Sequence, residues 1–78
     1  MDKRKAQNFS DKVVTILKEE RIQQKISQYR MANDIGMSKS SILYIENLKQ
    51  RPSFYTIVMM ASYLKLDLSK IIKRINKQ

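Results

Sequence analysis

The chain's only glycine, Gly36, divides residues 27–47 and constrains the fold more than any other residue. Glycine adopts a positive φ at little cost, and it commonly ends a helix. Apolar side chains recur at helical spacing on both sides of it; they are Met31, Ala32 and Ile35 before the glycine and Ile42 and Ile45 after it. The stretch therefore predicts two short helices, at about residues 28–35 and 39–47, joined by a tight turn.

Serines precede both helices, and Ser27 and Ser38 can each accept a hydrogen bond from a free backbone N–H of the first turn. The side of the second helix opposite its apolar residues carries no acid. That side holds Ser40, Leu43, Tyr44 and Asn47, with Lys39 at its leading edge. An exposed helix of this kind, in a basic domain, meets the physical requirement for entering a DNA major groove.

The balance of charge indicates a polyanionic partner. Lys and Arg total 16 against 7 acidic residues, a formal net charge of +9. This excess favours nucleic acid first and an anionic membrane second, with solubility alone as the remaining explanation. The chain has no Cys and no His, which excludes disulfides, zinc fingers and the common nucleophile–base pairs. We therefore expect no enzymatic activity, no metal and no cofactor.

The length of 78 residues predicts one domain. No apolar run approaches the roughly 20 residues that span a membrane, and the polar start shows no signal-peptide pattern. We therefore expect a cytoplasmic protein without membrane contact. Residues 1–8 are polar and basic, so we expect a flexible arm there, which reaches DNA or is simply a solvated tail. Residues 9–78 would form the domain.

Three further helices follow from caps and apolar spacing, which makes the predicted fold an all-α bundle of five helices. The first of them begins after Ser10 as its cap and fades near residues 21–24. The next covers about 54–64 after Ser53, and the last about 68–77 after Asp67. Apolar residues in the last helix recur at helical spacing. Part of this stripe must close the core, and the candidates for an interface with a second subunit are Leu68, Ile72 and Ile75.

A spaced set of residues in this chain resembles the helix-turn-helix family of phage repressors and Cro proteins (Xre-like). The set is Ser27-Gln28, Met31-Ala32, Gly36, Ser38, Ile42, Ile45-Glu46 and Pro52-Ser53. The resemblance covers about residues 9–72 and implies a compact five-helix, lambda-repressor-like DNA-binding domain. It places the helix-turn-helix at the second and third helices. The chain departs from the family at Lys25, Leu48 and Lys65, where relatives often have glycine.

The resemblance assigns base contacts to the third helix. Lys39, Ser40 and Tyr44 match the positions that meet base edges in family complexes. Lys39 can donate to guanine acceptors, whereas Ser40 donates or accepts and discriminates weakly. Tyr44 would stack on the sugar–phosphate backbone or donate from its hydroxyl. Leu43 would meet a thymine methyl or rest on neighbouring side chains.

Phosphate contacts are expected from four residues. The resemblance gives Gln28, at the start of the second helix, a phosphate contact and a role in bracing the recognition helix. Ser41 lies off the central face and is a candidate for phosphate rather than base. Lys49 and Arg51 are candidate phosphate ligands from the loop after the third helix, although an exposed basic loop residue is often only solvated.

An ion pair between Arg21 and Glu46 is also implied by the resemblance, and it would join the first helix to the recognition helix. The alternative is two unconnected surface charges. Since specific family complexes usually hold two monomers on a two-fold operator, we expect a homodimer on double-stranded DNA. No small-molecule ligand is evident from the sequence.

The function that follows is a sequence-specific transcriptional regulator, a repressor or autoregulatory controller that binds a palindromic operator as a dimer. The alternative is an antitoxin or other protein-interaction module whose DNA binding serves autoregulation. A membrane-surface peptide would need one basic amphipathic helix with an unburied apolar face, and five helices that can bury one another argue against it.

Overall fold

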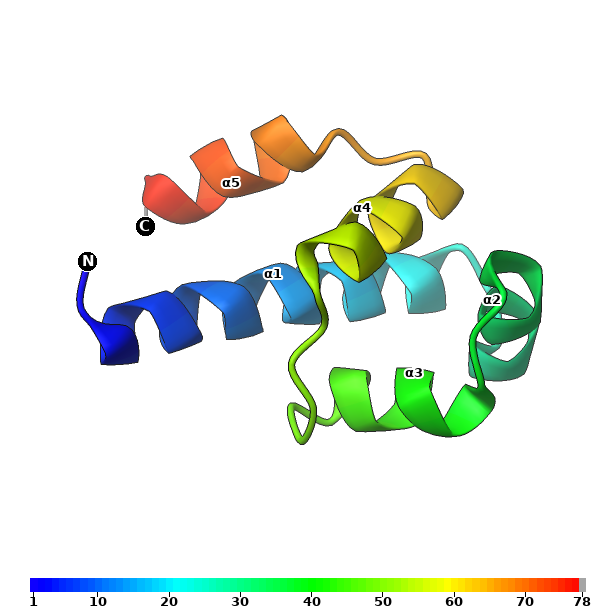
Figure 1. Cartoon of the computed structure of the whole chain (residues 1–78). Coiled ribbons are helices and arrows are strands. Elements are labelled where there is room, and N and C mark those ends of the chain that lie inside the picture. The colour runs from blue at the N-terminus through cyan, green and yellow to red at the C-terminus, as the bar shows by residue number, and fades with distance from the viewer. Residues whose placement is uncertain (78) are drawn as a thin grey trace.

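The long helix α1 (Lys3–Gln23) runs through the middle of the computed structural model, which describes residues 1–77 (Figure 1). The remaining helices are α2 (Gln28–Ile35), α3 (Lys39–Glu46), α4 (Phe54–Tyr63) and α5 (Leu68–Asn76). α1 packs against α3, α4 and α5, and α2 packs against α3 and α4. In Figure 1, α3 and α5 lie on opposite sides of α1. Residues 1–77 contain no strand, so the all-α prediction is confirmed.

The start of α1 differs from the prediction. The helix begins at Lys3 and not after Ser10, and its cap is Asp2, whose Oδ1 accepts from the backbone N–H of Lys5 at 2.8 Å. Residues 3–8 are exposed, so helix-forming residue types and this cap account for the extra turns, rather than burial. The expected cap at Ser10 is therefore wrong. The flexibility that we expected for residues 1–8 stays a prediction.

The core joins all five helices through apolar side chains. The largest of those that are almost wholly buried are Val14, Leu17, Met31, Ile42, Ile45, Met60 and Leu64. α5 adds Ile71 and Ile75, which pack toward α1. Burial of these side chains from every helix is what stabilises so short a chain.

Ile75 was expected at the interface with a second subunit, and the structure places it in the core of the monomer, 5% exposed. The reason is that α5 packs against α1, where Ile75 lines one hollow with Lys12 and Ile16 and another with Phe9 and Lys12. The prediction for Ile75 is therefore wrong. Leu68 and Ile72 are half-buried, and their contact with a second subunit stays a prediction.

A hydrogen bond between exposed side chains ties α4 to α2. The Tyr63 hydroxyl donates to Asp34 Oδ2 at 2.6 Å, and this bond raises the pKa of Tyr63 above its ordinary value of 10.0. At the start of α5, Asp67 Oδ1 accepts from the Ser69 hydroxyl at 2.6 Å and from its backbone N–H at 2.9 Å. The hydroxyl contact lowers the pKa of Asp67 below its ordinary value of 3.8. Both contacts fix the ends of short helices.

Four helices end in a left-handed residue, although the chain has one glycine. Gly36 has φ 75°, and Lys25, Leu48 and Lys65 have φ 61°, 60° and 60°. The residue after each one donates its backbone N–H to a carbonyl five residues earlier, as in the bond from Leu66 N to Ala61 O at 2.9 Å. These are Schellman-type helix ends. The three positions that lack the family glycine therefore keep the backbone conformation that glycine favours.

We expect Lys25→Gly and Lys65→Gly each to raise the free energy of unfolding by about 0.5–1 kcal/mol. The left-handed conformation costs an L-residue about 1–2 kcal/mol, and the greater chain entropy of glycine in the unfolded state offsets part of the gain. Urea denaturation measures the change. The control is Lys70→Gly inside α5, which should lose about 1 kcal/mol. A loss of stability at Lys25 and Lys65 as well would contradict this explanation.

Candidate nucleic-acid interface

The α2–turn–α3 unit has the geometry that its sequence predicts. Ser27 Oγ accepts from Arg30 N at 3.0 Å, and Ser38 Oγ accepts from Ser41 N at 3.1 Å, so both caps are confirmed. Gly36 adopts the left-handed conformation and ends α2 at the predicted residue. α3 begins at the predicted residue and ends one residue early, because Asn47 is its C-terminal cap.

α3 turns one side into the protein and the other into solvent. Ile42, Ile45 and Glu46 are buried. The residues expected to contact bases lie together on the exposed side, and they are Lys39, Ser40, Leu43 and Tyr44. Half of Tyr44 is accessible, and Leu43 is less exposed at 38%. This side of α3 is therefore accessible to a ligand, and it carries no acidic residue.

A buried polar cluster fixes the far end of α3. Arg21 Nε donates to Glu46 Oε2 at 2.7 Å, and Arg21 Nη2 donates to Glu46 Oε1 at 2.9 Å. Arg21 Nη1 also donates to the Ile26 carbonyl at 2.6 Å. The ion pair that the resemblance led us to expect is thus present, in the bidentate geometry that makes such pairs strong. It joins α1, the loop before α2, and α3.

Gln28 completes this cluster, because its Nε2 donates to Glu46 Oε1 at 2.9 Å. The side chain at the start of α2 thereby holds α3, which is the bracing role that the resemblance implied. The described residues leave no buried side-chain nitrogen or oxygen without a hydrogen-bond partner. A buried charged group in such a satisfied cluster specifies one position for α3 and penalises others.

The other residues expected to contact phosphate lie at the two ends of α3. The Ser41 hydroxyl accepts from Ser38 Oγ at 2.9 Å, so it is part of the cap and only half-exposed. Lys49 and Arg51 are exposed on the loop after α3. The loop also closes a largely polar hollow of about 230 Å³ with Gln7 and Ser10 of α1. Two positively charged side chains are therefore placed beside the C-terminal end of α3.

Tyr29 is a candidate that the sequence analysis missed. The residue is 67% exposed at the first turn of α2. It lines a hollow of about 200 Å³ together with Asn33, Ser38 and Lys39, between α2 and the start of α3. The available signal was an aromatic residue directly after Gln28 on the exposed side of a short helix. A tyrosine hydroxyl in this position can donate a hydrogen bond to a phosphate oxygen.

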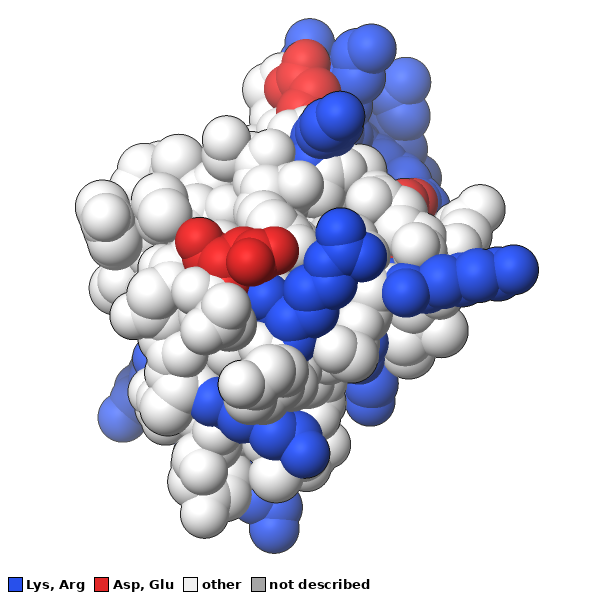
Figure 2. All heavy atoms as spheres, turned by 90° about the vertical axis from the view of Figure 1, so that its right-hand side faces the viewer, with Lys and Arg blue, Asp and Glu red and all other residues white. Residues whose placement is uncertain are grey.

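Basic side chains outnumber acidic ones on the face at the α2 end of the molecule (Figure 2). Figure 2 shows the molecule from the α2 end, with Lys and Arg at many points of the surface and few acidic side chains between them. One acid in this region is Asp34, whose Oδ2 lies 4.0 Å from Nε of Arg30, one turn earlier in α2. A surface with this excess of positive charge attracts a polyanion at a distance and loses affinity as salt rises.

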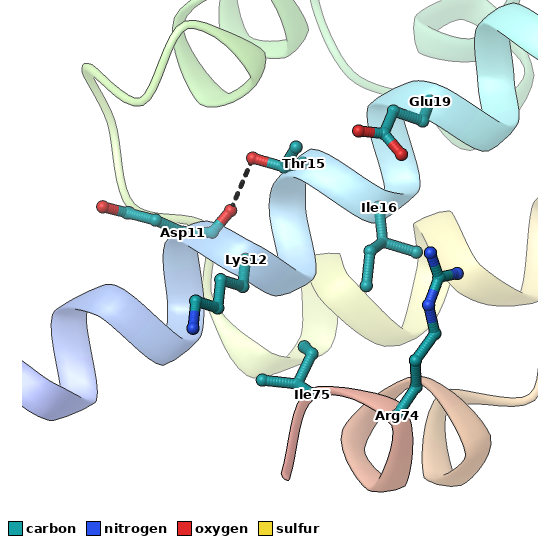
Figure 3. A pocket seen from close by; sticks show the side chains of 7 residues that line it. All are labelled: Asp11, Lys12, Thr15, Ile16, Glu19, Arg74 and Ile75. Atoms are coloured by element: carbon teal, nitrogen blue, oxygen red, sulfur yellow. Dashed lines mark hydrogen bonds between the residues drawn. The ribbon is translucent and has the colours of Figure 1, made fainter. Parts of the chain in front are cut away.

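A separate hollow of about 250 Å³ lies between α1 and α5, away from α3 (Figure 3). In Figure 3, Ile16 and Ile75 face the space between the helices, and Thr15 Oγ1 donates to the Asp11 carbonyl within α1. The lining mixes two acids and two cations with these isoleucines, and it offers no nucleophile with a neighbouring base. We interpret it as the groove left where α5 packs across α1.

The described residues contain neither a cluster of metal-ligating side chains nor a helix suited to cross a membrane. No group of three or more His, Cys, Asp or Glu side chains lies close enough to hold a metal ion. Across residues 1–77, none of the helices combines the length and the apolar character needed to pass through a bilayer.

Comparison with known proteins assigns the family. The model of the helix-turn-helix family matches residues 17–71, which is more than half of the chain and includes α2, the turn and α3. No curated protein and no solved structure matches the chain. The matched stretch contains the buried Arg21–Glu46–Gln28 cluster and the exposed side of α3. The chain belongs to the Cro/C1-type, Xre-like helix-turn-helix family of DNA-binding transcription regulators.

Proposed function

We propose that this regulator is a repressor or autoregulatory controller that binds a palindromic operator on double-stranded DNA as a homodimer, in the cytoplasm. The observation that carries the proposal is the acid-free exposed side of α3, held in one position by the buried Arg21–Glu46–Gln28 cluster. A rigid helix with free polar and basic side chains can enter the major groove without first reorganising.

Specificity would come from the exposed side of α3. Lys39 donates to guanine O6 and N7, and Ser40 adds a weaker, less selective contact. Tyr44 contacts the sugar–phosphate backbone or a base edge, and Leu43 meets a thymine methyl. Their common exposure on one side of the helix supports this assignment.

Affinity would come from phosphate contacts on both sides of the groove. Gln28 and Tyr29 at the start of α2 would hold one backbone, with Ser41 at the start of α3. Lys49 and Arg51 would hold the backbone at the other end of α3. Such contacts fix the register of the protein on DNA and carry little sequence information.

The experiment that tests the proposal selects bound duplexes from a random library at moderate salt and sequences them. We expect enrichment of an inverted repeat whose half-sites lie about one helical turn, roughly 34 Å, apart. Enrichment of a single unrepeated half-site would reject the dimer. Salt-sensitive bulk binding without any enrichment would reject a sequence-specific regulator and favour a non-specific DNA-binding protein.

Salt dependence gives an independent measure of the contacts. If each monomer neutralises about four phosphates, the logarithm of affinity should fall against the logarithm of salt with a slope of roughly −7 for the dimer. Lys49→Ala should make this slope shallower by about 2, since one contact is lost from each monomer. Titration by fluorescence anisotropy between about 50 and 200 mM salt measures both slopes. An unchanged slope for Lys49→Ala would remove Lys49 from the phosphate contacts.

A further inference from the structure

α4 differs from the other four helices because it has no charged residue, although the chain is strongly basic. Its buried side packs Ile57, Met60 and Ala61 into the core. Its other side leaves Phe54 76% exposed, Tyr55 73% and Val58 41%. These three residues, which we call the α4 patch, lie on adjoining positions of one helix side, and residues 1–77 leave them largely open to solvent.

The size of the α4 patch is that of a functional surface. A fully buried aromatic side chain covers about 150–250 Å², so the two exposed rings alone offer on the order of 300 Å². The largest apolar patch of an ordinary monomer has about this area and is often a binding site. With a polar rim, a patch of this kind can form the centre of an interface that buries about 800 Å² on each partner.

The charges of α4 and α5 differ, and this difference favours α4 as the helix that a second copy of the chain contacts. α5 offers the half-buried Leu68 and Ile72, but the same helix carries the exposed Lys70, Lys73 and Arg74. Two copies related by a two-fold axis through α5 would bring these cations close together. An axis through α4 places two uncharged helices face to face, which avoids this repulsion.

We propose that the α4 patch is the surface on which a second copy of this chain docks. The proposal rests on the proposed function, since the dimer is the unit that would bind the two-fold operator. It moves the interface from the Leu68 and Ile72 side of α5, where the sequence suggested it, to the start of α4. Residues 47–53 connect α3 directly to Phe54, so contact at α4 would set the spacing of the two recognition helices.

Sedimentation equilibrium of the whole chain, over a concentration range of about 1 μM to 1 mM, tests the proposal. We expect Phe54→Glu to raise the dimer dissociation constant by more than about 30-fold, as truncation of a central aromatic anchor does. The controls are Ile22→Glu at an exposed isoleucine of α1 and Ile72→Glu at a half-buried isoleucine of α5, because each places the same charge outside the patch. Both should keep the dissociation constant within about threefold of the unmodified chain. Circular dichroism and the melting temperature establish that all three variants fold.

The outcomes separate the surfaces. An unchanged dissociation constant for Phe54→Glu overturns the proposal, and dissociation by Ile72→Glu alone places the interface on α5. A chain that is monomeric throughout, and that also fills two half-sites without cooperativity, overturns it too and leaves the α4 patch to a different protein.

Binding of Phe54→Glu to a single half-site duplex distinguishes the two proposals. Retained half-site affinity with lost cooperativity supports both, whereas absence of half-site binding by the unmodified chain rejects the DNA function alone.

Discussion

Glu46→Ala should lower the free energy of unfolding by about 3–5 kcal/mol, because it leaves the Arg21 guanidinium buried without its counter-ion. Arg21 is 8% exposed and Glu46 4%, so water cannot replace the lost carboxylate without opening the structure. The change also removes the acceptor of the Gln28 amide. A chain of this length is expected to have a free energy of unfolding of about 4–12 kcal/mol, so the substitution should remove a large part of it.

Urea denaturation followed by circular dichroism measures this loss. The control is Glu19→Ala on the exposed side of α1, which should change stability by less than about 0.5 kcal/mol. The double variant Arg21→Met/Glu46→Leu should recover most of the loss, because replacing both charges by apolar groups removes the buried charge. A small effect of Glu46→Ala would mean that the cluster opens readily to water.

Lys39→Ala combined with Tyr44→Ala should weaken binding to the selected operator by about a hundredfold or more, with folding intact. Each side chain acts in both half-sites, and a good base contact contributes about 1–3 kcal/mol of discrimination. Both lie on the exposed side of α3 and contribute nothing to the core, so the melting temperature should stay within a few degrees. Anisotropy titration with operator and with unrelated duplex separates specific from bulk affinity.

The matched control for this double variant is Lys73→Ala on α5. It removes one positive charge as well, but from the helix that lies across α1 from α3 (Figure 1). It should weaken binding to the operator and to unrelated duplex alike, and only slightly. If the double variant keeps the full operator affinity, α3 does not enter the groove in the proposed way.

The helix-turn-helix was predictable from sequence because its signals are local. Ser27 and Ser38 each accept a hydrogen bond from a backbone N–H three residues later, and Gly36 adopts the left-handed conformation that ends α2. These effects act within a few residues, so they do not depend on the rest of the fold. The apolar spacing of α3 then set which side is buried. The Arg21–Glu46 pair joins residues far apart in sequence, and only the resemblance to a known family suggested it.

The two errors concern the start of α1 and the position of Ile75 in α5. Residues 3–8 bury little, so their polar composition suggested a helix start after Ser10, whereas the cap at Asp2 and good helix formers extend α1. Ile75 belongs to the core, where α5 packs against α1, and is not free for a second subunit. Apolar spacing shows that a helix has a buried side, but it cannot show what lies against that side. The exposure of Tyr29 depends in the same way on packing.

The left-handed residues at Lys25, Leu48 and Lys65 bear on how members of this family diverge. At these places the hydrogen bonds of the helix ends hold the backbone in the left-handed conformation. A side chain other than glycine is accepted there at some cost in the free energy of folding. A family member whose fold is stable enough can therefore carry lysine or leucine in place of each glycine and keep the same architecture. The two lysines also raise the positive charge, so such exchanges can trade robustness for attraction to DNA.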